Sequence, residues 1–400
     1  MDEIITVING GSSSLKFSVF DIAEKARLER RLAGQIEGLG ARPHFVARDR
    51  AGAMLDDRPL THGETADRQS LLGFVIDWVK AHAADAKTIG FGHRVVHGGP
   101  EFRAPAIVDA NMLEALERLR PLAPLHLPDN IAYIEAAIDK APGLPQVACF
   151  DTAFHRDHPR LADLFALPRQ LYEDGVRRYG FHGLSYEYIA RQLPVVAPDI
   201  ADGRVIVAHL GSGASMCALN GGRSVDSTMS FTPLDGLPMG TRPGALDPGV
   251  VLHLIRERNM DADAVERLLY KESGLLGLSG VSNDVRELSA SAAPHAREAL
   301  DYLVYRVAQL LGSLAASLGG VDGIVFTAGI GENAPEIRAR ICHAAAWMGV
   351  VLDERENARG GPLITQERST VSARVIPTDK ERMIGLHALA LLQDRGSGAG

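Results

Sequence analysis

The sequence has little of what disulfide-linked, metal-cluster or nucleic-acid-binding proteins require. Its 400 residues include only three cysteines, Cys149, Cys217 and Cys342, and no two have the spacing of a zinc site or redox pair. The formal net charge is −8 and no basic stretch reverses it, so a nucleic-acid groove is not expected. These observations predict reduced thiols in a cytoplasmic protein that binds no nucleic acid.

Long apolar runs are also missing. A membrane span needs about 18 uncharged apolar residues, and the best stretch, 303–320, contains Arg306 and Gln309. The sequence begins MDEIITV, with acids where a secretory signal carries Lys or Arg. We therefore expect no membrane association. A chain of 400 residues is too long for one hydrophobic core, which predicts two domains.

One short phrase occurs twice, 200 residues apart. The first copy reads VINGGSSSLKF (7–17) and the second reads VAHLGSGASMC (207–217). Each begins with an apolar stretch that predicts a strand, and its glycines and serines allow several backbone N–H groups to approach an anion. Two such loops on separate halves of the chain predict two half-sites for one polyphosphate, and hence nucleotide chemistry in a duplicated fold.

Strand and helix signals alternate along the chain, which is typical of an α/β fold. The segment 41–68 is polar and broken by Gly and Pro, and is expected to form peripheral strands and loops. Asp109 or Asn111 is expected to cap the helix at 112–119. The expected strands are 4–8, 15–20, 147–150, 204–210, 323–327 and 374–376, and the expected helices are 71–82, 112–119, 296–318 and about 381–393.

Three glycine loops follow predicted strands, at 9–14, 209–215 and 329–333. One such loop is most often only a turn, and Lys16 beside the first is either a phosphate ligand or a solvated strand lysine. Three loops in this context favour a phosphate or nucleotide site. None matches G-x-x-x-x-G-K-S/T, which excludes a P-loop enzyme. Asn333 is expected to cap the helix after the third loop.

Cations and an acid that suit phosphate chemistry occur in short polar phrases. Arg94 lies in GHRVVHGG, Arg242 in MGTRPG and Arg286 in SNDVREL. His182 lies in RYGFHGLS, and Asp151 follows a predicted strand, where open α/β sheets place ligand-binding groups. Each residue alone is more often structural. Together they provide the charges that stabilise a phosphoryl group during transfer.

A longer set of phrases points to one protein family. They are NGGSSSLKF, GHRVVHGG, PLAPLH, FDTAFH, YGFHGLS, HLGSGAS, SFTPLDGLPMGTR, GLLGLSG, GIGEN and IPTD, in that order. With these phrases the chain resembles the acetate kinase family over essentially its whole length. The resemblance implies an α/β fold of two duplicated actin-like (ribonuclease-H-like) domains with the active site in the cleft between them. It implies an N-terminal domain of 1–150 plus about 381–400, and a nucleotide-binding domain of 151–380.

The resemblance implies reversible phosphoryl transfer from ATP to acetate by direct in-line attack, giving acetyl phosphate and ADP. It also implies Mg²⁺, with Mn²⁺ as an alternative metal, and a cytoplasmic homodimer. A carboxylate with a pKa of roughly 4–5 needs no general base near neutral pH. Catalysis by positioning and charge stabilisation is therefore expected, with Asp151 orienting Arg94, Arg242 or the metal.

The resemblance also assigns roles to matching residues. The catalytic residues would be Arg94, Asp151, His182 and Arg242. The substrate would be bound by Arg94, Val96, Leu125, His126 and Phe181, with Val96 closing the pocket for the methyl group. The metal would be held by Asn9 and Glu381. The residues in contact with ATP would be Ser12, Ser14, Lys16, His209, Leu210, Gly211, Ser212, Gly213, Asp284, Val285, Arg286, Gly329, Ile330, Gly331, Glu332 and Asn333.

Two departures from the family pattern bear on the chemistry. Ser212 replaces an Asn of the second phosphate loop. Lys380 stands where the family carries the first Glu of PTNEE or PTDEE, which contributes to the Mg²⁺ site. A lysine cannot ligate Mg²⁺, which takes oxygen ligands. Either Glu381 or Asp379 is therefore expected to take the place of the missing carboxylate, or the metal is expected to be held less tightly.

Three alternative functions remain open from the sequence. A propionate or butyrate kinase is one, because Val96 favours a small acid but an apolar pocket separates substrates by one methylene only about 10–200-fold. An actin-like ATPase without a carboxylate substrate is another, although the paired arginines and compact loops argue against it. A catalytically weak homologue is the third, on the basis of Lys380 and Ser212.

Overall fold

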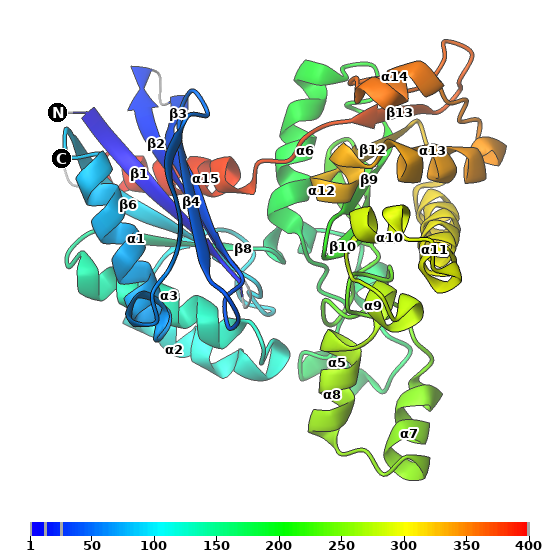
Figure 1. Cartoon of the computed structure of the whole chain (residues 1–400), viewed down its shortest axis with the longest axis horizontal. Coiled ribbons are helices and arrows are strands. Elements are labelled where there is room, and N and C mark those ends of the chain that lie inside the picture. Colours follow the sequence, from blue (N-terminus) through cyan, green and yellow to red (C-terminus); the bar gives the residue numbers. More distant parts are fainter. Residues whose placement is uncertain (1, 12–13, 25–26, 398–400) are drawn as a thin grey trace. The chain divides into compact units, whose positions relative to one another are not determined.

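The computed structural model describes residues 2–11, 14–24 and 27–397. The chain divides into two compact units, whose elements are labelled in Figure 1. Unit 1 comprises 1–153 and 379–400, and unit 2 comprises 154–378. Because the chain returns to unit 1 for its last helix, Asp151 and Glu381 belong to the same unit as Arg94.

Unit 1 is built on a mixed sheet. Its strands are β1 (Asp2–Gly10), β2 (Ser14–Ala23), β3 (Arg27–Glu37), β4 (His44–Asp49), β5 (Met54–Pro59), β6 (Ala86–Val95), β7 (Ala106–Ile107) and β8 (Gln146–Phe150). Their order in the sheet is β5-β4-β3-β2-β1-β6-β8-β7. β1 to β5 form an antiparallel meander, whereas β1, β6 and β8 run parallel. The polar segment 41–68 contributes β4 and β5 at the edge, as expected.

Helices cover both faces of this sheet. They are α1 (Arg68–His82), α2 (Ala110–Arg118), α3 (Leu127–Lys140) and α15 (Lys380–Ser397), with 3-10 turns η2 (Gly63–Thr65) and η3 (Arg120–Leu122). Successive strand side chains point to opposite faces, and Ile4 and Ile8 of β1 pack in one core with α1 and α3. Asn9 points the other way and contacts Glu381 at the start of α15. α15 therefore covers the opposite face (Figure 1).

Side-chain caps set where α1 and α2 begin. Asp67 accepts a hydrogen bond from the N–H of Ser70 at 2.7 Å, and Asp109 accepts one from the N–H of Met112 at 2.8 Å. Such a cap contributes about 1 kcal/mol to helix stability. Of the two caps expected for the helix at 112–119, Asp109 is confirmed, and Asn111 lies inside the first turn.

Unit 2 repeats the central topology of unit 1. Its strands are β9 (Arg204–Leu210), β10 (Ala214–Asn220), β11 (Arg223–Ser227), β12 (Gly323–Thr327) and β13 (Ser372–Val375), in the order β11-β10-β9-β12-β13. β9 pairs antiparallel with β10 and parallel with β12, as β1 does with β2 and β6. β1 and β9 come from the two copies of the duplicated phrase. The predicted duplication of an α/β core is confirmed.

The other elements of unit 2 are helices. They are α4 (Arg160–Asp163), α5 (Arg169–Glu173), α6 (Gly183–Val196), α7 (Pro248–Glu257), α8 (Ala262–Lys271), α9 (Gly274–Ser279), α10 (Val285–Ala290), α11 (Pro294–Leu318), α12 (Ala328–Asn333), α13 (Pro335–Ala344) and α14 (Glu354–Arg359), with 3-10 turns η4 (Ala153–His155, at the boundary) and η5 (Ala346–Met348). Val205 and Val207 of β9 pack in one core with Tyr186 and Ile189 of α6. The long helix α11 contacts β9, β10 and β11, so unit 2 is also a layered α/β structure.

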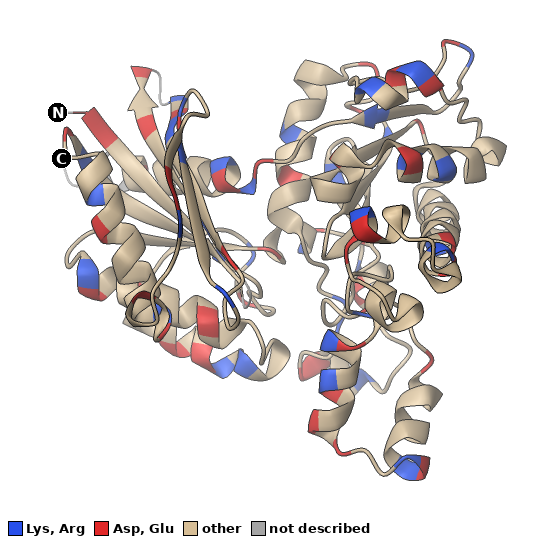
Figure 2. Cartoon of the chain, in the orientation of Figure 1, with Lys and Arg blue, Asp and Glu red and all other residues tan. Residues whose placement is uncertain are grey.

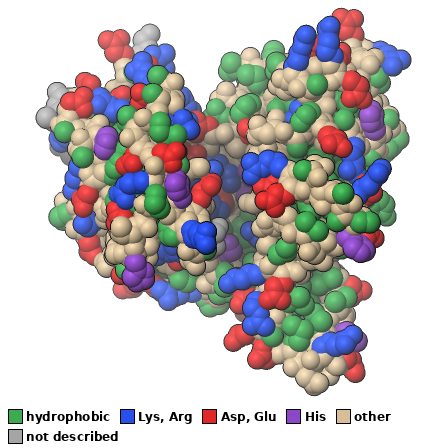
Figure 3. Space-filling model, viewed as in Figure 1, with side chains coloured by type: hydrophobic (Ala, Val, Ile, Leu, Met, Phe, Trp, Pro, Cys, Tyr) green, Lys and Arg blue, Asp and Glu red, His purple; other side chains and the backbone are tan. Residues whose placement is uncertain are grey.

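The surface carries charges of both signs. Figure 3 shows acidic and basic side chains interspersed on the visible face of each unit. Within the described residues, no helix combines the length and the apolarity that a membrane span needs. Several apolar side chains on and around α7 and α9 are 40–49% exposed, namely Leu246, Val250, Leu252, Ile255, Leu278 and Val281.

Candidate active site

Arg94 and Asp151 form an ion pair at the ends of neighbouring strands of unit 1. Arg94 is the penultimate residue of β6, and Asp151 directly follows β8. Nε and Nη2 of Arg94 donate hydrogen bonds to Oδ2 of Asp151 at 2.8 and 2.5 Å. The Asp151 side chain is fully buried, whereas 15% of the Arg94 side chain remains exposed. Asp151 was expected to orient Arg94, Arg242 or the metal, and in the structure it binds Arg94. The ion pair holds the guanidinium in an orientation that suits contact with an anion.

Asn9 and Glu381 meet near the start of α15. Nδ2 of Asn9 donates to Oε1 of Glu381 at 2.7 Å. Asp379, the alternative metal ligand, instead accepts from Arg30 at 2.6 Å and from the backbone N–H of Arg382 at 2.9 Å. An amide oxygen and a carboxylate are ligands that Mg²⁺ accepts. In the described part of the chain, no group of three or more His, Cys, Asp or Glu is placed to hold a metal.

Lys380 is the first residue of α15 and is half-buried. Its ammonium group lies within electrostatic reach of Asp151, Arg94, Glu381 and Lys16. Burial lowers the pKa of Lys380 to about 8, although the two carboxylates oppose this shift. Lys16 lies on β2, beside β1. Figure 2 shows both signs of charge in the first turn of α15.

Asn130 supports the segment that carries Val96. Val96 follows β6 and is buried. Its N–H donates to Oδ1 of Asn130 at 2.9 Å, and Nδ2 of Asn130 donates to the carbonyl of Gly10 at 3.2 Å. Leu125 and His126 lie just before α3, the helix that carries Asn130. Asn130 was not predicted from the sequence, although its place four residues after the phrase PLAPLH was an available signal.

His182 of unit 2 has a strained backbone. Its φ of 58° lies in the left-handed region, which is rare for a residue other than glycine and is found mainly at functional sites. Nδ1 of His182 hydrogen-bonds to Oγ of Ser215 at 2.8 Å, and that hydroxyl also contacts the Tyr186 hydroxyl at 2.5 Å. The His182 and His209 ring centroids are 4.3 Å apart, and Phe181 is buried. Ser215 and Tyr186, not predicted from the sequence, therefore fix the His182 ring.

The second glycine turn lies against His182 and Arg242. It follows His209 and Leu210 of β9 and consists of Gly211, Ser212 and Gly213. A Cβ atom at Gly213 would lie 3.5 Å from Nε2 of His182 and 3.8 Å from Nη2 of Arg242. The carbonyl of Ser212 accepts a hydrogen bond from the N–H of Gly240 at 3.2 Å, which ties the turn to the loop of Arg242. Unit 2 therefore brings the side chains of His182 and Arg242 beside the glycine turn at 211–213.

Residues 329–333 form a helical turn, α12, where a loop was expected. Oε1 of Glu332 accepts hydrogen bonds from the N–H of Ala328 at 2.7 Å and of Thr378 at 3.1 Å. The buried guanidinium of Arg338 donates to the carbonyl of Glu332 at 2.8 Å. The prediction of a loop is wrong because these contacts, which include one from Thr378 far along the chain, hold the segment in a helical conformation.

Asn333 does not cap the following helix. Its Nδ2 donates back to the carbonyl of Gly329 at 3.0 Å, and it is the last residue of α12. α13 begins at Pro335 with Ala334 in the cap position. The expected role of Asn333 as a helix cap is therefore wrong, and its side chain instead closes α12.

The other residues that were predicted to contact the nucleotide lie at the ends of helices and strands. Asp284 caps α10 by accepting from the N–H of Arg286 at 2.8 Å, and the Arg286 side chain, 89% exposed, holds the pKa of Asp284 below its usual value. The side chain of Val285 is buried, so only its backbone is available to a ligand. Ser14 begins β2, and Ser12 lies outside the described residues.

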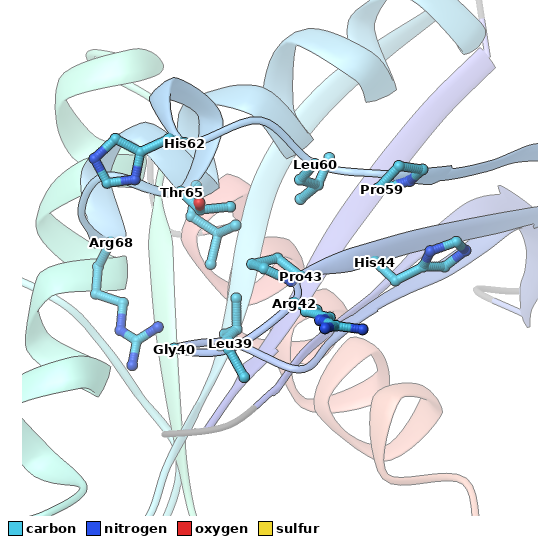
Figure 4. Close-up of a pocket in the computed structure, with 12 residues that line it drawn as sticks. Leu39, Gly40, Arg42, Pro43, His44, Pro59, Leu60, His62, Thr65 and Arg68 are labelled. Atoms are coloured by element: carbon cyan, nitrogen blue, oxygen red, sulfur yellow. The ribbon is translucent and has the colours of Figure 1, made fainter.

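A separate pocket of unit 1 contains none of these candidate residues among its described lining. Its volume is about 720 Å³, and Figure 4 shows that it lies between the β3–β4 turn, the end of β5 and the start of α1. Leu39, Leu60 and Leu71 provide apolar lining, and Arg42 and His62 provide polar lining. This pocket is not part of the candidate active site.

Sequence comparison identifies the family. Residues 4–386 match the profile of the acetokinase family. The chain belongs to the acetokinase family. It is 53% identical to the acetate kinase of Nitrobacter hamburgensis, over 99% of this chain and 98% of that protein. It is 50% identical to the acetate kinase of Rhizobium meliloti, over 98% of this chain and 99% of that protein.

Solved structures of the family agree with the fold. The chain is similar to Porphyromonas gingivalis acetate kinase with a TM-score of 0.85, at 33% identity over 98% of this chain and 100% of that chain. It is similar to a propionate kinase from Francisella tularensis with a TM-score of 0.88, at 34% identity over 96% of this chain and 98% of that chain. The predicted fold class of duplicated actin-like domains is therefore confirmed.

Proposed function

We propose that this chain is an acetate kinase, which transfers a phosphoryl group reversibly between ATP and acetate. The observation that carries the proposal is the Arg94–Asp151 pair at the ends of β6 and β8, in a chain that matches the acetokinase family over residues 4–386. A buried carboxylate holds a guanidinium in one orientation there, which suits the recognition of a small carboxylate or a phosphoryl oxygen.

Each polar residue of the site has a role in this reaction. Arg94 binds the acceptor carboxylate, which is ionised near neutral pH and needs no general base. Asp151 positions Arg94. His182 and Arg242 donate hydrogen bonds to the phosphoryl oxygens and stabilise the charge that develops during transfer. Ser215 keeps His182 in place through its Nδ1 hydrogen bond.

In this proposal the remaining candidate residues bind the nucleotide and its metal. The phosphates contact Ser14, Lys16 and the turn at 211–213, and the nucleoside contacts the start of α10 and α12. Mg²⁺, when bound, neutralises charge on the phosphate oxygens. Asn9 and Glu381 would hold it, because the Asn9 amide lies against the Glu381 carboxylate and because Asp379 accepts hydrogen bonds from Arg30 and from the backbone of α15.

A test of function compares acetate, propionate and butyrate in one assay. Acyl phosphate formation is measured with Mg–ATP at equal concentrations of each acid, and acetate should give the highest kcat/KM. A higher value with propionate or butyrate would favour the alternative substrates. ADP release that is independent of any carboxylate would instead indicate an ATPase and overturn the proposal.

Glu381→Gln should raise the Mg²⁺ concentration that gives the half-maximal rate. Glutamine keeps the size of the side chain but removes the charge that attracts a divalent cation. Asp379→Asn is the matched control and should leave this concentration near that of the wild type, since Asp379 is engaged by Arg30. Mg²⁺ titration of the initial rate measures both. Equal values for Glu381→Gln and the wild type would exclude Glu381 as a ligand.

Val96→Ala should shift the preference from acetate toward propionate by roughly fourfold. One buried CH₂ contributes about 0.8 kcal/mol, and the smaller side chain leaves room for it. The measurement is the ratio of kcat/KM for acetate to that for propionate. Val95→Ala, the buried neighbour in β6, is the control and should leave the ratio unchanged. An unchanged ratio in Val96→Ala would place the methyl pocket elsewhere.

We propose further that the chain forms a homodimer in the cytoplasm. Exposed Leu278 and Leu246 line a shallow pocket of unit 2 together with Tyr302, and apolar side chains of this kind favour a protein interface. The three cysteines are buried and form no disulfide within the described residues, which suits a reducing compartment. The mass in solution, measured by light scattering, should be twice that of the 42.9 kDa chain.

A further inference from the structure

His155 is fully buried in unit 2, and no role was predicted for it from the sequence. It is the last residue of the phrase FDTAFH and of the 3-10 turn η4. Its Nε2 lies 2.9 Å from the carbonyl oxygen of Phe181, the residue that precedes His182. A carbonyl oxygen only accepts, so Nε2 carries a hydrogen and donates it. His155 is therefore hydrogen-bonded to the backbone directly beside the strained His182.

The ring of His155 is also held at its other nitrogen. Nδ1 lies 2.8 Å from Oγ of Ser224, a buried hydroxyl of β11. When the imidazole is neutral, Nδ1 has no hydrogen and accepts from Ser224, which favours the tautomer with the hydrogen on Nε2. The ring lies edge-on to that of Tyr186, with centroids 5.7 Å apart. These contacts set the orientation in which Nε2 meets the Phe181 carbonyl.

The backbone that His155 contacts is unusual at two positions. Gly180 has a φ of 76° and His182 has a φ of 58°, in the left-handed region that costs free energy for a residue other than glycine. A Cβ atom at Gly180 would lie 2.6 Å from Cγ of His155, so the ring packs directly against this turn. The N–H groups of Tyr179 and Gly180 donate to the carbonyl of Ser230 at 3.0 and 3.2 Å. Hydrogen bonds therefore hold this segment in a conformation that is unfavourable for His182 alone.

A role for His155 as the base of a cysteine nucleophile does not fit the surroundings. Sγ of Cys217 lies 4.0 Å from Nδ1 of His155 and 3.4 Å from Oγ of Ser224. Burial raises the pKa of the Cys217 thiol to about 12, and its side chain is fully buried. A nucleophilic cysteine needs a thiolate that a substrate can reach. The contacts of His155 instead support the backbone beside His182.

We propose that His155 is a positioning residue, which holds the backbone at 180–182 so that the His182 ring meets the transferred phosphoryl group. This inference rests on the proposed function, in which His182 donates to the phosphoryl oxygens, and adds a residue to it. Donors that stabilise developing charge must be in place before the reaction begins. Because Arg94 belongs to unit 1 and His155 to unit 2, loss of the His155 contact should lower kcat and leave the binding of acetate by Arg94 unchanged.

The test compares His155→Asn with His155→Gln. The amide nitrogen of glutamine reaches the place of Nε2 and donates to the Phe181 carbonyl, whereas the shorter asparagine reaches only the place of Nδ1. His155→Asn should lower kcat for acetyl phosphate formation about 10- to 100-fold, because a displacement near 1 Å costs about 100-fold in rate. KM for acetate should not change, and His155→Gln should retain most of the wild-type kcat. His253→Asn, at an exposed position of α7, is the matched control and should behave like the wild type.

A double-variant cycle separates action through His182 from a general loss of stability. In a His182→Ala background, adding His155→Asn should not lower kcat again, because the side chain that His155 positions is already gone. If His155 only supports the fold, the two losses multiply. Urea unfolding shows which variants are folded at the assay temperature. His155→Leu fills the buried space without a ring nitrogen and replaces His155→Asn in the same comparison if the asparagine variant does not fold.

Three results would overturn the proposal. They are wild-type kcat in a folded His155→Asn or His155→Leu, losses that multiply in the cycle, and a folded His155→Gln that loses as much activity as His155→Asn. Failure of the proposed function has a separate signature, namely no acetyl phosphate formed by the wild type from acetate and Mg–ATP. Since the wild type is measured in the same assay, the two failures are distinguishable.

Discussion

Arg242→Ala is expected to lower the rate of acetyl phosphate formation by roughly 10³- to 10⁵-fold, the range in which arginine stabilises phosphoryl transfer in other enzymes. A Cβ atom added at Gly213 would lie 3.8 Å from Nη2 of Arg242 and 3.5 Å from Nε2 of His182. Hydrogen-bond donors that are already held in place around a glycine turn stabilise the charge that develops in the transition state, because the site needs little reorganisation during the reaction. The measurement is kcat with saturating acetate and Mg–ATP.

Arg242→Lys separates the charge of this residue from its shape. The lysine keeps the positive charge but lacks the planar fork that contacts two oxygens, so it should recover only a small part of the lost rate. Arg297→Ala, at an exposed position of α11, is the control and should behave like the wild type. Rates near those of the wild type in Arg242→Ala and Arg242→Lys would remove Arg242 from the mechanism.

The central fold could be predicted from short-range patterns. The apolar runs at 4–8 and 204–210 each lie in a strand, and the Gly–Ser phrase after each run marks the same hairpin in both units. Such runs are local features of the sequence, and a strand buried on both faces requires them. Repetition of the phrase therefore indicated a repeated topology before any contact was known.

The error at 329–333 has a tertiary cause. Ala328 has a φ of 67°, which a residue other than glycine adopts only when its surroundings require it. Its N–H is bound by Glu332, which also binds Thr378 far along the chain. Glycines in the sequence favoured a loop, but no local pattern shows that a carboxylate would close the turn.

The residue types of the site were predictable, whereas their pairing was not. Arg94 and Asp151 come from phrases 57 residues apart, and only the parallel arrangement of β6 and β8 brings them together. The proposal of Glu381 rather than Asp379 as a metal ligand depends on Arg30, 349 residues from Asp379. The sequence left both ligands open because neither contact has a local signature.

Asp151→Asn should reduce both activity and stability, for one physical reason. The variant leaves the Arg94 guanidinium largely buried without its counter-charge, beside the cations Lys16 and Lys380. Removal of one partner of a buried pair costs about 3–5 kcal/mol, and the lower end applies because Arg94 retains 15% exposure. A displaced guanidinium also lowers turnover, by about 100-fold for a shift near 1 Å.

A double variant separates the two effects of Asp151. Adding Arg94→Met to Asp151→Asn removes the unpaired charge, so the free energy of unfolding should recover part of the loss while activity stays low. Urea unfolding and kcat for acetyl phosphate formation measure the two quantities on the same preparations. If Asp151→Asn unfolds like the wild type, the pair does not stabilise unit 1. If it also turns over like the wild type, the orientation of Arg94 does not depend on Asp151, because a residue that positions the arginine cannot lose its charge without an effect on the rate.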